Sequence, residues 1–191
     1  MPNALTAIPQ SVLRYLRIQP DTHACAEALP LWREARALSQ PRTWRKRLDM
    51  GDFLEAFAPH AAESVDLSRT LAGCREVVLM ACTIGSALET RGREYFSQGR
   101  PFAGFMLDRM GSYLVEAEMR GLHAAVRAEN AASGLVATRR YSPGYKDFSL
   151  EAQAHFIRLI GDALPGLTLS SAFMLTPDKS VTAVCGIKTP A

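Results

Sequence analysis

Hydrophobic residues recur every three or four positions over several stretches of this chain, and that spacing predicts amphipathic helices. The expected helices cover His23–Leu38, Ala87–Phe96, Phe102–Asn130 and Leu150–Leu164. A shorter helix, capped by Asp66 or Ser68, is expected to end near Leu71. The segment of 29 positions from Phe102 to Asn130 is the longest and is therefore expected to organise the fold.

Breakers and caps set the bounds of these helices. Pro41 and the Gly99–Pro101 segment cannot continue a helix, so the helix before each of them is expected to end there. Gly134 follows the longest segment and is typical of a helix C-terminal cap, and Ser149 is a suitable N-cap. One face of the longest segment favours close packing of another element, because it carries small residues: Gly111, Ala117, Gly121 and Ala124.

Short apolar runs bounded by turn residues predict strands. The expected strands are Thr43–Met50, Glu76–Cys82, which is expected to be buried, and Leu135–Thr138. Two more apolar runs, Leu167–Leu175 and Ser180–Ile187, are separated by Thr176–Lys179, which predicts a hairpin. These elements predict an α+β fold, with a mixed or antiparallel sheet, a long central helix and flanking helices. We expect one domain over residues 1–191, with an N-terminal helical and strand part over 1–70 and a core motif region over 76–187.

The composition is that of an ordinary globular protein. The 191 residues are 48% hydrophobic and 21% charged, which excludes a chain that is disordered throughout. The four cysteines are far apart, and Cys82 and Cys185 lie in apolar runs, so we expect buried thiols rather than disulfides. No apolar run is long enough to span a membrane and no secretory signal is visible, so we expect a cytoplasmic protein with no membrane partner.

The net charge of +3 has one conspicuous local source, the basic run Arg42–Arg47. Such a run either contacts an anionic partner such as nucleic acid or forms an exposed strand with long basic side chains. The exposed strand is favoured, because no second basic helix or zinc-finger spacing accompanies the run. We therefore expect no nucleic-acid partner.

Familiar catalytic motifs do not occur. The sequence has no H-E-x-x-H, no P-loop, no G-x-G-x-x-G and no G-x-S-x-G, and its four histidines are scattered. His123, on the longest helical segment, is interpreted as a packed or surface histidine. We expect no catalytic residue and no metal site, and whether the chain is an enzyme stays open.

Three segments nevertheless carry unusual chemistry. The glycine turn Thr83–Ser86 opens a helix, and it either binds an anion or is an ordinary turn. Arg139–Tyr145 places arginines and tyrosines around a Pro-Gly turn, which suits a carboxylate and an adenine or cation, although a structural turn is equally expected. Glu116 lies among apolar and small residues, where it needs an arginine or a cationic ligand unless it is exposed.

These segments also carry a family resemblance. Arg140–Tyr145 resembles the R-x-x-P-G-Y motif of the activation domain of cobalamin-dependent methionine synthase. Val77–Ser86 is similar to that family's strand and glycine turn, and Leu107–Arg127 to its long helix, including the glutamate. Phe173–Ala183 resembles the closing hairpin of the family. Four motifs in the same order make the resemblance specific.

The resemblance implies a protein that binds S-adenosylmethionine and remethylates cobalamin that has slipped into the inactive cob(II)alamin state, with an electron from a flavodoxin-like donor. The sequence lacks the cobalamin motif D-x-H-x-x-G, so the cobalamin would be carried by a partner, a methionine synthase or a related corrinoid protein. The alternative is a non-catalytic module that docks on a corrinoid protein, or binds another small ligand, without methyl transfer.

The resemblance also implies roles for individual residues. Arg140 would hold the carboxylate of the ligand, and Glu116 would face its positively charged amino or sulfonium end. Tyr145 would stand where the ligand meets the corrinoid. Backbone groups of the turn would line the ligand at Ser142, Pro143 and Gly144.

Overall fold

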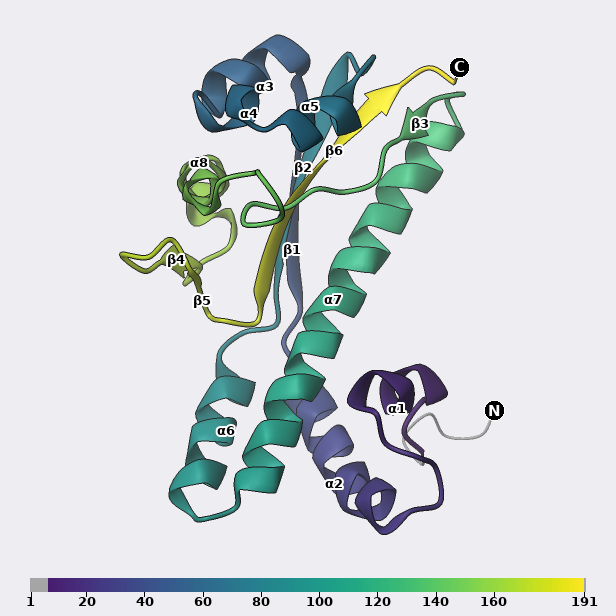
Figure 1. Cartoon of the computed structure of the whole chain (residues 1–191), viewed down its shortest axis with the longest axis vertical. Coiled ribbons are helices and arrows are strands. Elements are labelled where there is room, and N and C mark those ends of the chain that lie inside the picture. Colours follow the sequence, from purple (N-terminus) through teal and green to yellow (C-terminus); the bar gives the residue numbers. More distant parts are fainter. Residues whose placement is uncertain (1–6, 191) are drawn as a thin grey trace.

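A four-stranded antiparallel sheet forms the centre of the computed structural model, which describes residues 7–190 (Figure 1). The strand order is β1-β2-β6-β3, and the bounds are β1 Arg42–Asp49, β2 Glu76–Thr83, β6 Ser180–Lys188 and β3 Val136–Ala137. The two central strands are buried almost throughout, which explains their continuous apolar sequences. The predicted α+β class is confirmed, and every ladder in the sheet is antiparallel.

One long helix dominates the first face of the sheet. Helix α7, Pro101–Ala131, runs beside the strands along most of the molecule (Figure 1). Three helices gather around its N-terminal half: α1 Gln10–Leu16, α2 His23–Leu38 and α6 Ala87–Ser97. The core between α7 and the sheet includes Met80, Leu107 and Met110, each fully buried. Burial of this face explains the helical periodicity of the α7 sequence.

Short helices cover the opposite face of the sheet. They are α3 Met50–Ala56, α4 His60–Glu63, α5 Val65–Leu71 and α8 Gln153–Ile160, with single turns of 3-10 helix over Leu150–Ala152 and Gly161–Ala163. Their core centres on Phe53, Phe57 and Phe156. A two-stranded hairpin, β4 Thr168–Leu169 with β5 Leu175–Thr176, lies beside α8 (Figure 1).

Local hydrogen bonds explain where the predicted caps are right and wrong. After α7, Gly134 (φ +70°) and Leu135 donate to the carbonyl oxygens of Ala131 and Asn130 at 3.0 and 2.9 Å, so the predicted glycine cap is confirmed. Ser149 also caps as predicted, because its side chain accepts from the Glu151 amide. The predicted caps at Asp66 and Ser68 are wrong, since Ser64 Oγ accepts from the Leu67 amide.

Three further expectations need correction, and two helices were missed. The closing hairpin is wrong: the run Leu167–Leu175 folds on itself as β4–β5, while β6 pairs with the distant β2 and β3. The Leu150–Leu164 segment is not one continuous helix but α8 flanked by two 3-10 turns. Helices α3 and α4 were not expected. The small-residue face of α7 is packed only in part, because Gly111 contacts Lys179 whereas Gly121 faces open space.

Candidate functional site

The site begins with a tight turn between β3 and α8. The amide of Tyr145 donates to the Ser142 carbonyl oxygen at 3.1 Å, and Gly144 has φ +82°. Proline at the second position and glycine at the third are the residues that a type II turn requires. A Cβ on Gly144 would stand 3.0 Å from Leu150 Cδ1, so the turn also packs tightly against the start of the following helix.

Two sets of contacts fix this turn to the rest of the protein. Tyr141 and Val184 of β6 exchange two backbone hydrogen bonds of 2.8 Å each. On the other side, Asp147 accepts from the Ser64 hydroxyl at 2.7 Å and from the Asp66 amide at 3.0 Å. These hydrogen bonds, that of Ser64 first, lower the pKa of Asp147. The turn therefore has a defined position relative to the sheet and to α5.

An ion pair joins the residue before this turn to the long helix. Arg140 Nη2 donates to Glu116 Oε2 on α7 at 2.5 Å. The Arg140 side chain is 25% exposed and that of Glu116 41%, so both charges can be reached from solvent. Of the partners considered for Glu116, the structure supplies an arginine. The pair links two segments that the resemblance assigned to opposite ends of one ligand.

A cavity of about 270 Å³ adjoins the turn. Its lining comes from the turn, the start of α8, and the segment from β5 to β6: Ser142, Pro143, Leu150, Gln153, Met174, Leu175, Asp178, Ser180, Val181 and Thr182. The Thr182 hydroxyl donates to Gln153 Oε1 at 2.6 Å, which ties α8 to β6 at the cavity wall. The volume lies near the lower limit of small-molecule pockets, roughly 300 Å³.

The six residues singled out in the sequence therefore lie in one contiguous region, but they occupy different positions relative to the cavity. Ser142 and Pro143 line the cavity, and Glu116 and Arg140 form the ion pair outside its lining. Gly144 shapes the turn. Tyr145 is 57% exposed, with its ring edge-on to that of Tyr141 at 5.5 Å. The structure brings the helix and the turn together, but it places neither Gly144 nor Tyr145 in the cavity wall.

The buried thiol of Cys82 and the partly buried imidazole of His123 lie near this region. Burial, followed by the charges of Glu116 and Glu118, raises the pKa of the Cys82 thiol to about 12. His123 donates from Nε2 to the Thr138 carbonyl oxygen at 2.9 Å, and its burial lowers its pKa. His123 is thus a packed histidine, as its position on the helix indicated.

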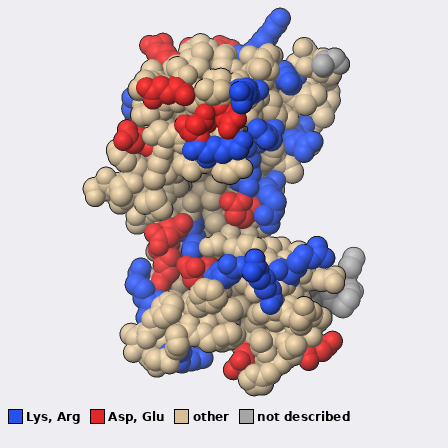
Figure 2. Space-filling view, in the orientation of Figure 1, with Lys and Arg blue, Asp and Glu red and all other residues tan. Residues whose placement is uncertain are grey.

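The glycine turn Thr83–Ser86 and the basic run Arg42–Arg47 both make hydrogen bonds or ion pairs within the chain. In the glycine turn, the Gly85 amide donates to Thr83 Oγ1 at 3.2 Å, so that N–H is not free for an anion. The basic run forms the edge strand β1, and Arg45 and Arg47 pair with Glu129 and Glu76 at 2.7 Å each. Basic and acidic side chains are interspersed on the face shown in Figure 2. The exposed-strand interpretation of Arg42–Arg47 is the one the structure supports.

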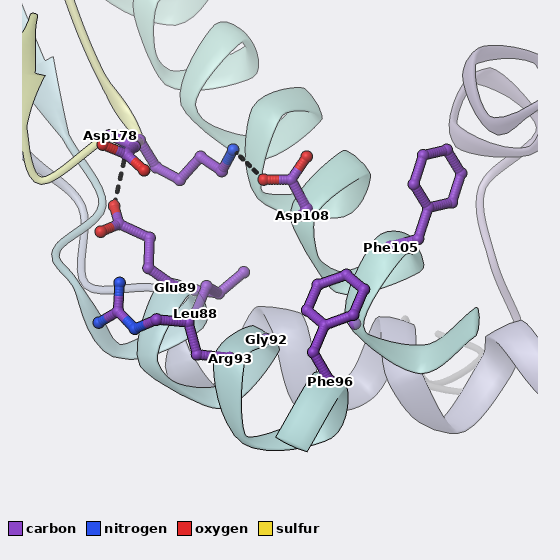
Figure 3. Close-up of a pocket in the computed structure, with 10 residues that line it drawn as sticks. Leu88, Glu89, Gly92, Arg93, Phe96, Phe105, Asp108 and Asp178 are labelled. Atoms are coloured by element: carbon purple, nitrogen blue, oxygen red, sulfur yellow. Dashed lines mark hydrogen bonds and ion pairs between the residues drawn. The ribbon is translucent and has the colours of Figure 1, made fainter. Parts of the chain in front are cut away.

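Sequence reasoning missed a second cavity, of about 210 Å³, between α6 and α7. Figure 3 shows Phe96 and Phe105 on one side of it and Glu89 with Asp178 on the other. The Lys179 ammonium donates to Asp108 at 2.6 Å, and the Lys179 amide donates to Glu89 at 3.1 Å. Two of its carboxylates are therefore already bound within the chain. This cavity combines the consecutive helices α6 and α7 with the distant residues Asp178 and Lys179, so no local motif marks it.

Further findings concern the whole described chain. Among residues 7–190, no group of three or more His, Cys, Asp or Glu side chains is placed to hold a metal ion. None of the helices in that range combines the length and the apolar character needed to cross a membrane. All four cysteines are free, and Cys82 and Cys185 are buried as predicted.

Comparison with known proteins identifies a similar fold. The crystal structure of the MetH reactivation domain bound to AdoHcy matches with a TM-score of 0.60, covering 93% of this chain and 68% of that chain. The sequence identity is 15%, so the likeness shows a shared fold. No family profile matches the sequence, and no curated protein matches it. The resemblance found in the sequence motifs thus agrees with the observed architecture of sheet and long helix.

Proposed function

We propose that this chain binds S-adenosylmethionine at the Glu116–Arg140 pair and the adjoining turn, and serves the reductive remethylation of cobalamin carried by a partner protein. The observation that carries the proposal is the solvent-accessible ion pair beside a Pro-Gly turn. It occurs on the fold of a domain that was crystallised with AdoHcy. The partner would be a methionine synthase or another corrinoid protein, with a flavodoxin-like electron donor.

The charges of the site fit the amino-acid end of this ligand. That end is a zwitterion, with one carboxylate and one ammonium group, and an arginine–glutamate pair is its electrostatic complement. Glu116 engages Nη2 of Arg140, and the guanidinium has further N–H donors for a carboxylate. A zwitterion inserted between the two side chains would replace one ion pair with two. The exposed ring of Tyr145 would offer a face for the adenine or the sulfonium.

The site needs no acid or base for this task. The bound ligand would supply a methyl group on a cationic sulfur, and the nucleophile would be the reduced cobalt of the partner's cobalamin. The residues of this chain would hold and orient the ligand. Glu116 would attract the ammonium group of both S-adenosylmethionine and its thioether product, and only the additional positive charge on the sulfonium would favour the former.

Calorimetry with S-adenosylmethionine tests the binding proposal. Removing a hydrogen bond to a charged group costs about 1.5–3 kcal/mol, which is a loss of about 10- to 150-fold in affinity. We expect Arg140→Ala to show that loss and Arg139→Ala to bind like the parent protein. Arg139 is the matched control, because it is the adjacent arginine and contacts Thr70 instead, at 3.4 Å. Absence of binding at millimolar ligand, or an equal loss in both variants, would overturn the proposal.

The closed ion pair also favours a second candidate, a non-catalytic module that docks on a corrinoid protein or binds another small ligand. In that case Arg140 and Glu116 would serve only to tie the turn to α7, since each already satisfies the other. Transfer of a labelled methyl group from S-adenosylmethionine to the cobalamin of a corrinoid methyltransferase, with a low-potential one-electron reductant present, distinguishes the two. Ligand binding without any transfer would identify the non-catalytic module.

A further inference from the structure

Four side chains form a continuous chain of hydrogen bonds between α4 and α8. His60 Nδ1 and His155 Nε2 are 3.0 Å apart. At one end, His60 Nε2 lies 3.3 Å from Glu151 Oε2. At the other end, Arg158 Nη2 lies 3.4 Å from His155 Nδ1. The order is therefore Arg158, His155, His60, Glu151, and no motif in the sequence marked the two histidines as neighbours.

The two ends of this chain dictate where the protons lie. Arginine can only donate and an ionised carboxylate can only accept. His155 must therefore present a lone pair at Nδ1 and carry its proton on Nε2, which donates to His60 Nδ1. His60 then carries its own proton on Nε2 and donates to Glu151. All contacts are satisfied at once when both imidazoles are neutral and both are Nε2–H tautomers.

Any added proton breaks this arrangement. A proton on His155 Nδ1 would face an N–H of Arg158, so donor would meet donor and cation would meet cation. A proton on His60 Nδ1 would face the N–H of His155 across 3.0 Å. The carboxylate of Glu151 favours charge on His60, but His155 must then change tautomer and release Arg158. Each protonated form thus loses a contact that the neutral form has.

The hydrogen-bonded chain connects elements that lead to the cavity. Arg158 also donates to the Ala56 carbonyl oxygen at 2.8 Å, and the ring of His155 packs on Phe57 at 5.2 Å, so α8 is held against α3 and α4. Glu151 belongs to the 3-10 turn that precedes α8. The same turn supplies Leu150, which lines the cavity and whose Cδ1 would lie 3.0 Å from a Cβ added at Gly144. Movement of α8 would therefore be transmitted to the cavity wall and to the Pro-Gly turn.

We propose that the Arg158–His155–His60–Glu151 chain is a proton-operated latch, closed near neutral pH, whose opening in mild acid loosens the α8 wall of the cavity. Burial, the charge of Arg158 and that of His60 lower the pKa of His155, so His155 takes up its proton at a lower pH than an exposed histidine does. The charged or titratable groups that contact the two imidazoles are Glu151 and Arg158. The latch acts on the cavity wall, whichever ligand the cavity binds.

Nuclear magnetic resonance of the full chain provides the first test. At about pH 7.5, nitrogen shifts of the imidazoles should show His60 and His155 both as Nε2–H tautomers. On acidification below about pH 6.5, the Leu150 methyl and Gly144 amide signals should shift together with the His155 ring signals. His23, whose side chain is 87% exposed and lies 3.3 Å from that of Glu27, is the internal reference for an imidazole outside the latch. Another tautomer pair, or titration of both rings without a change at Leu150 and Gly144, would overturn the proposal.

Variants separate the latch from general acid effects. His155→Gln should abolish the pH-dependent shift of the Gly144 signal, whereas His23→Gln and His123→Gln should retain it. The His123 variant is needed because burial lowers the pKa of that histidine too. His60→Gln provides a second route if the His155 variant does not fold: the charge of His60 helps to lower the pKa of His155, so the Gly144 shift should move to higher pH in this variant. Persistence of the parent pH response in a folded His155 variant, or an unmoved response in the His60 variant, would contradict the latch.

Discussion

Replacing Gly144 by alanine tests whether the Pro-Gly turn is held rigid by its packing on Leu150. Alanine at φ +82° costs about 1–2 kcal/mol, of which about 0.4–1 kcal/mol is offset by the smaller entropy of the unfolded chain. In addition, the new Cβ would lie 3.0 Å from Leu150 Cδ1. The Leu150 side chain must therefore leave its preferred rotamer, at a cost of about 0.5–1.5 kcal/mol. We therefore expect Gly144→Ala to lower the free energy of unfolding by about 2 kcal/mol.

Gly166 provides a matched control for the cost of backbone strain at positive φ, without a steric clash. It has φ +81°, and a Cβ there would have no neighbour within 4 Å. Gly166→Ala should therefore cost only about 1 kcal/mol. For a protein of this size, 1 kcal/mol corresponds to about 2–4 °C, so Tm should fall by about 4–8 °C for Gly144→Ala and about half as much for the control.

Urea unfolding followed by circular dichroism measures both variants on the same scale. A double variant, Gly144→Ala with Leu150→Ala, should lose less stability than the sum of the two single variants, because the new methyl then enters space that Leu150 occupied. Equal losses at the two glycines, with additive behaviour in the double variant, would refute the view that Leu150 supports the turn.

Two further predictions concern groups around the site. Hydrogen bonds from Ser64 and the Asp66 amide lower the pKa of Asp147, so its contribution to stability is complete above the ordinary value of 3.8 and is lost as the pH falls through the lowered pKa. Asp147→Asn should therefore be less stable at neutral pH and show a flatter acid-unfolding curve, and an acid limb as steep as that of the parent would contradict this. Burial raises the pKa values of Cys82 and Cys185 to about 12, so iodoacetamide should label the partly exposed Cys25 in the native protein and both buried thiols only after unfolding. Mass spectrometry of labelled peptides decides the point, and native labelling of either buried thiol at the rate of Cys25 would contradict it.

Elements that bury a continuous face could be predicted from the sequence, because burial leaves a periodic pattern. Helix α7 and strand β2 are within a residue or two of their expected bounds. The closing hairpin could not be predicted, since Thr176–Lys179 has the composition of a turn but the pairing of β6 with β2 depends on long-range contacts. Helices α3 and α4 were missed because they are only seven and four residues long, too short for a helical period to stand out.

The candidate site shows the same division between local and long-range information. The Pro-Gly turn could be predicted because its two residues determine their own backbone angles. The pairing of Arg140 with Glu116 could not be predicted. It depends on how the chain reverses direction after α7, so that the residues that follow β3 lie beside the middle of that helix. The same holds for His60 and His155, which are 95 positions apart and meet only when α8 packs on α4.

Titration of the isotope-labelled protein with S-adenosylmethionine tests the central claim most directly, because amide and guanidinium signals locate the ligand residue by residue. We predict saturable shifts at the Gly144 and Tyr145 amides and at the Arg140 guanidinium, with loss of the Arg140–Glu116 contact seen in the free protein. The second cavity, between α6 and α7 and lined by Phe96 and Phe105, should remain unaffected. Absence of saturable shifts, or shifts confined to that second cavity, would contradict the assignment of this site to S-adenosylmethionine.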